Sequence, residues 1–391
     1  MRILIAPDKF KGAQSAREVA HHIATGIREA LPGAEIEEVP VADGGEGTAE
    51  VICQALGGSW SECAAHDAFA QSVTAHYAWL PERATAVMEM SAVAGFRQVR
   101  PDGFDIEEAT TFGVGEMMLA AARRGAREII VGLGGSVTND GGFGMARALG
   151  FQFFGKDDRE LGQAVSDLRA LARIDTSDVG EVLVPSTYLK KNRRLAQPPR
   201  QAVRVIAAAD VRNPLLGESG ASRVFGPQKG ATPEQVLILE DALARLADVV
   251  AAGFGVDYRA TPGGGAAGGL AFGLMSLCGA SIRPGFEVVA EAIGLESKIR
   301  SADIIVTGEG SLDRQTLAGK APAEVARIGR KLGKRVFAIV GRTDGDARLR
   351  ELFDGVYAVA DHARGEAENI RHTAELLREG GRRLATSLLL L

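Results

Sequence analysis

Cysteine and histidine are scarce in this chain of 391 residues, and their scarcity excludes several kinds of site. The three cysteines, Cys53, Cys63 and Cys278, have no C-x-x-C spacing. They predict neither a disulfide framework nor a zinc cage, and they fit a reducing cytosol. The six histidines form no H-E-x-x-H or H-x-x-x-H pair, and no G-x-S-x-G sequence is present for a serine hydrolase.

No long apolar run is present either. The apolar residues that follow Met1 are too few for the core of a signal peptide. The leucines at 388–391 fall far short of the roughly 20 residues that span a bilayer. We therefore expect a soluble, cytoplasmic protein with no membrane partner.

The chain has no strong excess of charge of one sign. Its formal net charge is −5, and acidic and basic residues are mixed along most of it, which argues against a nucleic-acid partner. An anionic ligand would have to be attracted locally, by a few lysines and backbone amides. One basic stretch, within residues 182–200, is predicted to be a solvated surface loop, and its role stays open.

What the sequence does contain is an alternation of short apolar runs and helical patterns. Its 46% of hydrophobic residues are enough for more than one core. The run at 2–6 predicts a strand, and Ser15 and Glu18 form a capping box that predicts the start of a helix ending at Pro32. A second such unit follows, with a strand predicted at 36–42, a glycine-rich turn and a helix that ends at residue 56. This alternation predicts an α/β protein with a parallel, helix-covered sheet.

The alternation of strands and helices is interrupted in the middle of the chain. Three short apolar segments between residues 60 and 90 leave no room for helices between them and predict antiparallel strands. The alternation of strand and helix returns after Gly319, with strands predicted at 335–340 and 356–360. Because both ends of the chain show the same alternation of strand and helix, we predict that residues 1–65 and 285–391 form one discontinuous α/β domain. The remaining residues, 66–284, are predicted to form an inserted mixed α/β domain.

Five turns that are rich in glycine and charged residues could carry chemistry. Phosphoryl transfer needs hydrogen-bond donors around the phosphates, a carboxylate-held Mg²⁺ and a group that orients the attacking hydroxyl. Open α/β sheets bind ligands at the carboxyl ends of their strands, where such turns lie. The five turns are residues 6–12, 41–48, 132–142, 262–269 and 307–320.

The first turn places one acid, Asp8, and two lysines, Lys9 and Lys11, directly after the opening strand. The lysines would neutralise a substrate carboxylate or a transferring phosphate, and Asp8 would bind the substrate. A plain loop with exposed lysines is the alternative, and these residues by themselves do not decide between the two.

The second turn contains Asp43, Gly44, Gly45 and Glu46. Glycines let backbone N–H groups approach an anion at a helix N-terminus, but two acids there would repel phosphate. The turn therefore favours binding of substrate hydroxyls or of Mg²⁺, with a tight turn capped by an acid as the alternative. Asp43 is the candidate for orienting the substrate and for the general base.

The third turn holds Gly134, Gly135, Ser136, Asn139 and Asp140. Each glycine costs conformational entropy on folding, so the many glycines here argue for phosphate or substrate binding. We assign the two glycines to phosphate binding and the three polar residues to substrate binding.

The fourth turn contains Gly263, Gly264, Gly265 and Gly268, three of which fit the pattern G-x-G-x-x-G. The run follows a Thr-Pro pair rather than a strand, and no ribose-binding acid follows at the required distance, so a dinucleotide site is not predicted. The run suits a nucleotide phosphate loop that opens a helix at 266–277.

The fifth turn offers Glu309 and Asp313 as Mg²⁺ ligands, with Lys320 nearby for phosphate. Either acid could instead be a helix cap. The Gly319-Lys320 pair lacks the upstream glycine and the following Ser or Thr of a P-loop, so a P-loop ATPase is excluded.

These turns, taken together and in order, resemble the bacterial type-1 glycerate kinase family. The likeness covers nearly the whole chain. The segments that carry it are APDKFKG at 6–12, VADGGEGT at 41–48, GGSVTNDGG at 134–142, VFGPQKGA at 224–231, GGGAAGGL at 263–270 and TGEGSLDRQT at 307–316.

The resemblance implies two α/β domains with a cleft between them, one of them a flavodoxin-like, three-layer unit built from both chain ends. It implies ATP and Mg²⁺ as cofactors and D-glycerate as substrate, with 2-phosphoglycerate favoured over 3-phosphoglycerate as product. It supports catalytic roles for Lys9, Lys11 and Asp43, and it places Lys229 in the nucleotide or phosphate site. A homodimer is one option for the assembly.

Three other functions stay open as interpretations of the sequence. A kinase for another small hydroxy acid would share these turns. A nicotinamide-dependent sugar-acid oxidoreductase would need a G-x-G-x-x-G directly after a strand, which is missing. A binding or regulatory module without catalysis would be expected to carry a secretion signal or a helix-turn-helix, and neither is visible in the sequence.

Overall fold

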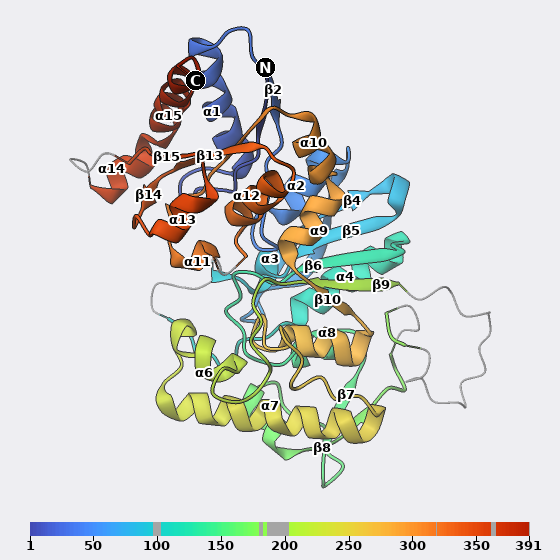
Figure 1. Cartoon of the computed structure of the whole chain (residues 1–391). Helices are drawn as coiled ribbons and strands as arrows, with labels where there is room; N and C mark the ends of the chain where they lie inside the picture. Colours follow the sequence, from blue (N-terminus) through green and yellow to red (C-terminus); the bar gives the residue numbers. More distant parts are fainter. Residues whose placement is uncertain (97–102, 180–182, 186–202, 318, 361–364, 391) are drawn as a thin grey trace. The chain divides into compact units, whose positions relative to one another are not determined.

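The computed structural model describes residues 1–96, 103–179, 183–185, 203–317, 319–360 and 365–390 (Figure 1). The lysines and arginines of the predicted basic loop lie outside the described residues. The fold is α/β, as predicted, with parallel strands and many helices.

The chain divides into two compact units. Unit 1 comprises Met1–Asp43, Glu50–Leu56 and Gly285–Leu391, and unit 2 comprises Gly44–Ala49 and Gly57–Pro284. Residues 57–65 group with unit 2 because their strand pairs there. That the two units fold as separate domains stays a prediction.

Unit 1 is built on five parallel strands in the order β15-β13-β11-β1-β2. Read from β2, this is the flavodoxin-like order 2-1-3-4-5, in which the direction of winding reverses between β1 and β11. The strands are β1 (Arg2–Ile5), β2 (Glu35–Glu38), β11 (Ile304–Thr307), β13 (Arg335–Val340) and β15 (Gly355–Ala358).

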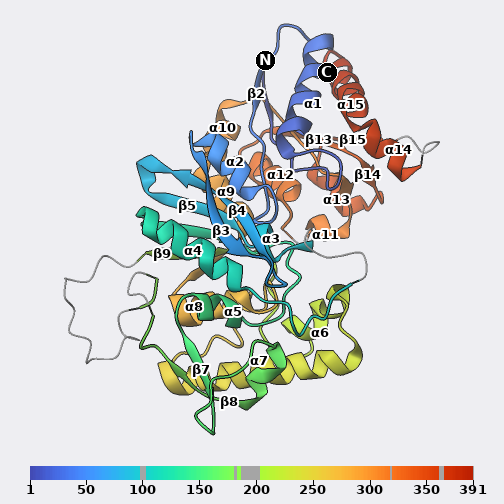
Figure 2. The ribbon, with the colours of Figure 1, turned by 180° about the vertical axis from the view of Figure 1, so that it is seen from behind.

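Helices cover both faces of this sheet (Figures 1 and 2). One face packs against α1 (Ala16–Ala30) and α15 (Thr373–Leu388), with Ile3 and Ile304 in their shared core. The side chains that alternate with these point to the opposite face. There α10 (Leu295–Ser301) and α12 (Ala321–Lys331) pack against β1, β11 and β13.

The first helix begins where the sequence predicts. The Ser15 hydroxyl accepts from the Glu18 amide, and the Glu18 carboxylate accepts from the Ser15 amide, which confirms the capping box. Gly26, in the middle of this helix, is required for close packing against α15. A Cβ on Gly26 would lie 1.9 Å from the carbonyl oxygen of Arg378 in α15.

The remaining elements of unit 1 are short. They are α9 (Gly285–Ala292), β12 (Ser311–Leu312), α11 (Arg314–Leu317), β14 (Arg342–Thr343), α13 (Ala347–Leu352) and α14 (Glu366–Arg371). The helix α2 (Thr48–Ala55) begins in unit 2 and continues in unit 1.

Unit 2 contains a six-stranded mixed sheet in the order β10-β9-β6-β5-β4-β3. Figure 1 labels β10, β9, β6, β5 and β4, and Figure 2 labels β3. The strand β4 runs antiparallel to both of its neighbours, which confirms the antiparallel prediction, and the others are parallel. The strands are β3 (Ser59–His66), β4 (Ser72–Leu80), β5 (Thr85–Glu89), β6 (Glu128–Gly132), β9 (Arg204–Ala208) and β10 (Ser281–Arg283).

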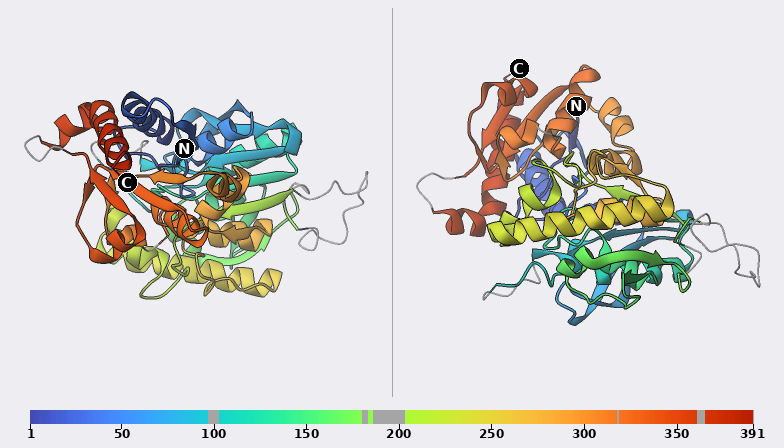
Figure 3. Two further views of the ribbon diagram at one scale, coloured as in Figure 1. Left: turned by 45° about the horizontal axis from the view of Figure 1, so that its top comes forward. Right: turned by 90° about the horizontal axis from the view of Figure 1, so that it is seen from below.

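A second set of elements packs on the core of unit 2, including the long helix α7, drawn in yellow in Figure 3. The helices are α3 (Ser91–Ala94), α4 (Phe112–Arg124), α5 (Phe143–Ala148), α6 (Ala221–Phe225), α7 (Pro233–Phe254) and α8 (Leu270–Cys278). A hairpin of β7 (Gln152–Gly155) and β8 (Leu171–Asp175) also belongs to the unit, as do the 3₁₀ turns η1 (Pro81–Arg83), η3 (Val165–Ala170) and η5 (Pro227–Lys229).

The helix predicted at 266–277 is wrong at its start. The backbone has positive φ at Ala267, Gly268 and Gly269, so α8 begins only at Leu270. A left-handed residue cannot continue a right-handed helix, and the glycine run is therefore a turn that precedes the helix. Among the described residues, no helix is long and apolar enough to cross a membrane.

Candidate active site

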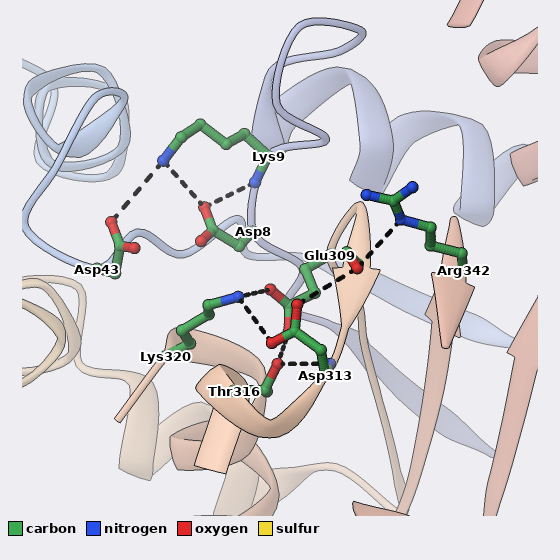
Figure 4. A network of polar contacts seen from close by, with 9 residues as sticks. Asp8, Lys9, Asp43, Glu309, Asp313, Thr316, Lys320 and Arg342 are labelled. Carbon is green, nitrogen blue, oxygen red and sulfur yellow. Dashed lines mark hydrogen bonds and ion pairs between the residues drawn. The ribbon is translucent and has the colours of Figure 1, made fainter. Parts of the chain in front are cut away.

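A polar cluster in unit 1 lies where three neighbouring parallel strands end (Figure 4). Asp8 follows β1, Glu309 follows β11, and Arg342 follows β13. The winding of the sheet reverses between β1 and β11, and ligands bind at such a point in open α/β sheets. The sequence predicted that the first and fifth turns carry chemistry, and the structure brings them together.

Close backbone contact holds the first and fifth turns in register. The Asp8 amide donates to the carbonyl oxygen of Gly308 at 2.8 Å. A Cβ on Gly308 would lie 2.0 Å from the carbonyl oxygen of Ile339 in β13, so a side chain has no room there. Glycine is therefore required for packing at this position.

Asp43 reaches the cluster although its strand is shorter than predicted. The strand β2 ends at Glu38 rather than at residue 42. The amides of Val39 and Val41 still donate to the carbonyl oxygens of Ile5 and Pro7, at 2.8 and 2.9 Å. The chain thus continues beside β1 as far as the acid.

The Lys9 ammonium lies between two carboxylates. Its Nζ is 3.8 Å from Oδ1 of Asp8 and 3.8 Å from Oδ1 of Asp43. The Asp8 side chain is buried, and burial raises its pKa to about 7, with the negative charges of Asp43 and Glu309 adding to the rise and Lys9 opposing it. A carboxyl that titrates near neutral pH can hold or release a proton during a reaction.

The fifth turn forms a second group of the same kind. The Lys320 Nζ lies 3.3 Å from Oε2 of Glu309 and 3.6 Å from Oδ1 of Asp313. The Thr316 hydroxyl donates to Oε1 of Glu309 at 2.6 Å. Burial raises the pKa of Glu309, and the hydrogen bond from Thr316 and the charge of Lys320 oppose that rise.

No role was predicted for three members of the cluster, Ser311, Thr316 and Arg342. Arg342 donates from Nε to the Ser311 hydroxyl at 3.3 Å, and that hydroxyl lies 3.4 Å from Oδ2 of Asp313. A signal existed, because Gly341-Arg342-Thr343 follows the predicted strand at 335–340 and so resembles the other five turns. The exposed Lys11, in contrast, makes no ion pair among the described residues.

Carboxylate oxygens are the donors that Mg²⁺ prefers, and Glu309 and Asp313 converge on one ammonium. No group of three or more acids, histidines or cysteines among the described residues is arranged to hold a metal ion. One or two carboxylates with substrate phosphates is nevertheless a usual setting for Mg²⁺. The donor set therefore fits this ion. Asp313 is the more accessible of the two acids, since Glu309 is buried.

In unit 2, the second and third turns pack backbone against backbone. A Cβ on Gly134 would lie 2.5 Å from Cα of Gly45, and one on Gly132 would lie 2.7 Å from the carbonyl oxygen of Gly44. Glu46, which was predicted to contact the substrate, is half-buried. The carboxylate that holds the start of α2 is that of Glu89, which no motif predicted.

Glu89 accepts from the amides of Gly47 and Ala49, each at 2.9 Å. The acid lies at the end of β5, and an acid at a helix N-terminus is stabilised by the helix dipole. The signal was again an acid at the end of a predicted strand.

Asp140 is buried, and its hydrogen bonds lie within the fold. Oδ2 accepts from the amide and hydroxyl of Thr111, at 2.9 and 2.8 Å, and from the Gly144 amide at 3.0 Å. Oδ1 accepts from the Gly142 amide at 3.0 Å. Burial raises its pKa and these bonds oppose the rise. The geometry favours a role in holding the turn, and direct substrate binding by Asp140 stays a prediction.

Lys229 lies beneath the third turn. Its side chain is buried, and Nζ donates to the Ser136 hydroxyl at 2.8 Å and to the Thr138 carbonyl oxygen at 2.6 Å. Burial lowers its pKa to about 7, and the charge of Asp140 opposes that change. The Asn139 amide donates to the hydroxyl of Ser222 at 2.9 Å.

The fourth turn packs on the third. Gly141 donates its amide to the carbonyl oxygen of Gly268 at 3.0 Å, and a Cβ on Gly268 would lie 2.1 Å from that of Thr138. A Cβ on Gly265 would lie 2.3 Å from the Pro214 carbonyl oxygen. Packing thus accounts for two of these glycines, and no strand directly precedes the run. Nucleotide binding by Gly263, Gly264, Gly265 and Gly268 stays a prediction.

A doubly wound α/β unit with lysines and acids at the reversal of its strand order is typical of enzymes that act on small anionic molecules. A family model described as the glycerate kinase family matches residues 3–389. The glycerate kinase of Bacillus subtilis (strain 168) is 36% identical over 390 residues, which cover 99% of this chain and 98% of that protein. The glycerate 2-kinase of Escherichia coli (strain K12) is also 36% identical, with the same coverage.

A solved structure gives the same result. A crystal structure from Salmonella typhimurium LT2, of a protein assigned as glycerate kinase 2, superimposes with a TM-score of 0.85 at 37% identity and covers 100% of this chain and 98% of that one. The chain therefore belongs to the glycerate kinase family. It is an enzyme of the kinase class.

Proposed function

We propose that this enzyme transfers the γ-phosphoryl group of ATP to D-glycerate, with Mg²⁺, and forms 2-phosphoglycerate. The family and the names of the relatives support glycerate as substrate, and one of them is named a glycerate 2-kinase. The observation that carries the proposal is the cluster of unit 1, in which each of two lysines bridges two carboxylates at the ends of adjacent strands.

In this proposal the residues divide by charge. Lys9 neutralises the negative charge that develops on the transferring group, and Lys320 and Lys11 contact phosphate. Asp43 orients the attacking hydroxyl and is the candidate general base. Asp8 contacts the same part of the substrate as Asp43, around the attacking hydroxyl, because Lys9 Nζ lies 3.8 Å from each of the two carboxylates.

Asp313 and Glu309 would hold the Mg²⁺ ion. When bound, the ion would neutralise charge on the phosphates and help to orient them. Thr316 holds the Glu309 carboxylate in place by its hydrogen bond. Arg342 donates to the Ser311 hydroxyl, and that hydroxyl lies next to the Asp313 carboxylate. The guanidinium thus adds a positive charge near Asp313.

A coupled assay of ADP release tests the reaction. With ATP and Mg²⁺, we expect turnover with D-glycerate and little with L-glycerate, lactate, tartronate or hydroxypyruvate. Higher turnover with one of these acids would show that the enzyme is a kinase for another substrate. A well-folded enzyme that ignores ATP and reduces hydroxypyruvate with NADH would overturn the proposal.

The position of the phosphate can be read from the product. In a proton-coupled ³¹P spectrum, a phosphate on the secondary hydroxyl couples to one carbon-bound proton and gives a doublet. A phosphate on the primary hydroxyl couples to two protons and gives a triplet. We expect the doublet.

A further inference from the structure

The turn after β6 in unit 2 has hydrogen-bonding groups that the fold does not use. Within the described part of the chain, the backbone N–H groups of Gly134, Gly135 and Ser136 donate to no acceptor. Consecutive backbone N–H groups in a glycine-containing turn form a concave site for an anion. Gly135 has φ of +76°, a left-handed conformation that turns the chain at this point.

Lys229 determines how Ser136 can act in this turn. Its Nζ donates to the Ser136 hydroxyl oxygen at 2.8 Å and to the Thr138 carbonyl oxygen at 2.6 Å. An ammonium has donors and no acceptor, so the hydroxyl proton of Ser136 must point away from Lys229. Ser136 therefore offers a hydrogen-bond donor, with a positive charge directly behind its oxygen.

Unsatisfied polar atoms lie next to these residues. Thr138 Oγ1 and Asn139 Oδ1 are buried, and neither has a hydrogen-bond partner in the described part of the chain. Buried polar atoms are nearly always paired, and an exception calls for an explanation such as strain, a catalytic role or a bound water or ion. The Thr138 hydroxyl can donate to an anion, whereas Asn139 Oδ1 only accepts and so suits a hydroxyl of the ligand rather than its carboxylate.

We propose that this turn binds the carboxylate of the hydroxy-acid substrate, and that Lys229 is a positioning residue that aims the Ser136 hydroxyl at it. The inference rests on the proposed function and deepens it, because it names the chemical group of the substrate that this turn binds. It also changes the role of Lys229, which was predicted to contact phosphate.

The charge at the turn favours a carboxylate over a phosphate. No arginine or second lysine hydrogen-bonds to this turn within the described residues, and the carboxylate of Asp140 lies behind it. On the neighbouring helix α6, Arg223 is paired with Glu218 and Glu240. One positive charge matches a monoanion, whereas the phosphates of a nucleotide need several cations.

The charge on Lys229 makes binding depend on pH. Its pKa is lowered to about 7 by burial, so the ammonium loses its proton as the pH rises through neutrality. A glycerate carboxylate stays ionised over that range. We therefore expect the dissociation constant of glycerate to rise between pH 6 and pH 8.5 in the wild-type enzyme, and to stay nearly constant in Lys229→Met.

Calorimetric titration of D-glycerate into nucleotide-free enzyme tests the proposal. Lys229→Met and Ser136→Ala should each weaken binding by roughly 10-fold or more, the range for a hydrogen bond to a charged group. Glyceramide, which lacks the negative charge, should bind wild type and Lys229→Met with similar affinity. Lys156→Met, which changes an exposed lysine of unit 2, is the matched control and should bind as wild type does.

Binding of a non-hydrolysable ATP analogue is measured in parallel and also reports that each variant is folded. If Lys229→Met and Ser136→Ala weaken the analogue and leave glycerate binding unchanged, the turn binds phosphate and the inference is wrong. If wild type binds and phosphorylates glycerate but neither variant changes glycerate affinity, the inference fails while the proposed function stands. If wild type neither binds nor phosphorylates glycerate, the proposed function itself has failed.

Discussion

Asp8 is a buried carboxyl whose effect on stability depends on pH. Its pKa is raised to about 7 in the folded protein, from 3.8 for the free group. Between these values the folded state holds a proton that the unfolded chain has released, so the free energy of unfolding falls as the pH rises from about 4 to 7. Above pH 7 the folded protein bears the full cost of a buried charge.

Asp8→Asn should therefore stabilise the protein at high pH. We expect a gain on the order of 1 to 3 kcal/mol at pH 8 and little change at pH 4.5, measured by urea unfolding. Turnover should fall by about 10²–10⁴-fold, as for loss of an orienting or proton-accepting group. A variant that is less stable than wild type at pH 8 would show that the carboxylate holds the fold together.

The two acids of the fifth turn should respond differently to Mg²⁺. Asp313 is partly exposed, whereas Glu309 is buried and accepts from Thr316 and Lys320. We expect Asp313→Asn to raise the Mg²⁺ concentration needed for half-maximal activity, with recovery at high Mg²⁺. Asp43→Asn should lower the rate at every Mg²⁺ concentration, since a hydroxyl-orienting group is not replaced by metal.

Titration of Mg²⁺ against each variant makes the comparison. Glu309→Gln should combine a higher Mg²⁺ requirement with lower stability, because it breaks a buried network. Recovery of Asp43→Asn by Mg²⁺, without recovery of the other two variants, would reverse the assignment of roles.

At the level of elements, the contact between α1 and α15 depends on Gly26, which has no side chain. Alanine favours helix over glycine by roughly 1 kcal/mol, which alone would make Gly26→Ala stabilising. A Cβ on Gly26 would lie 1.9 Å from the Arg378 carbonyl oxygen, so the helices must separate. We expect a net loss of about 1 to 3 kcal/mol.

Gly253→Ala is the control for this prediction. Gly253 lies in α7, and a Cβ there meets no atom within 4 Å. The control should be neutral or stabilising by up to about 1 kcal/mol, compared by thermal unfolding at one pH. Equal effects of the two substitutions would mean that α1 and α15 pack less closely than described.

At the level of the whole molecule, the two units differ in how they use the chain. Unit 2 draws the six strands of its main sheet from residues 59–283. Unit 1 places β1, from the start of the chain, between β2 and β11. A fragment of residues 44–284 should therefore fold alone, with a cooperative unfolding transition and native-like circular dichroism.

The fragment of residues 285–391 should remain unfolded, since it lacks β1 and the helix α1 that shares its core. If residues 44–284 also remain unfolded, the two units form one cooperative structure and the predicted domain division fails. A mixture of fragments 1–56 and 285–391 that recovers structure would support unit 1 as a discontinuous domain.

Local patterns were sufficient for much of the fold. The capping box of Ser15 and Glu18, the strands at the chain ends and the antiparallel segments in the middle depend on neighbouring residues, and the structure confirms them. Family membership also followed from local motifs, since those turns keep their residue types and order. The glycine run at 263–269 was misjudged as a helix start, because its φ angles are set by packing against the third turn.

The fold class, the family and the turns that carry charged residues could all be predicted from the amino-acid sequence, because they depend on periodicity, capping and residue type. Which of these turns meet is a property of the tertiary structure. It joined Asp8 to Glu309 across 301 residues of chain, added Arg342, and turned Asp140 inward to hold a loop. It also buried Lys229 beneath Ser136. The pKa of a side chain follows from burial and from the charges around it, and neither exists until distant segments pack together.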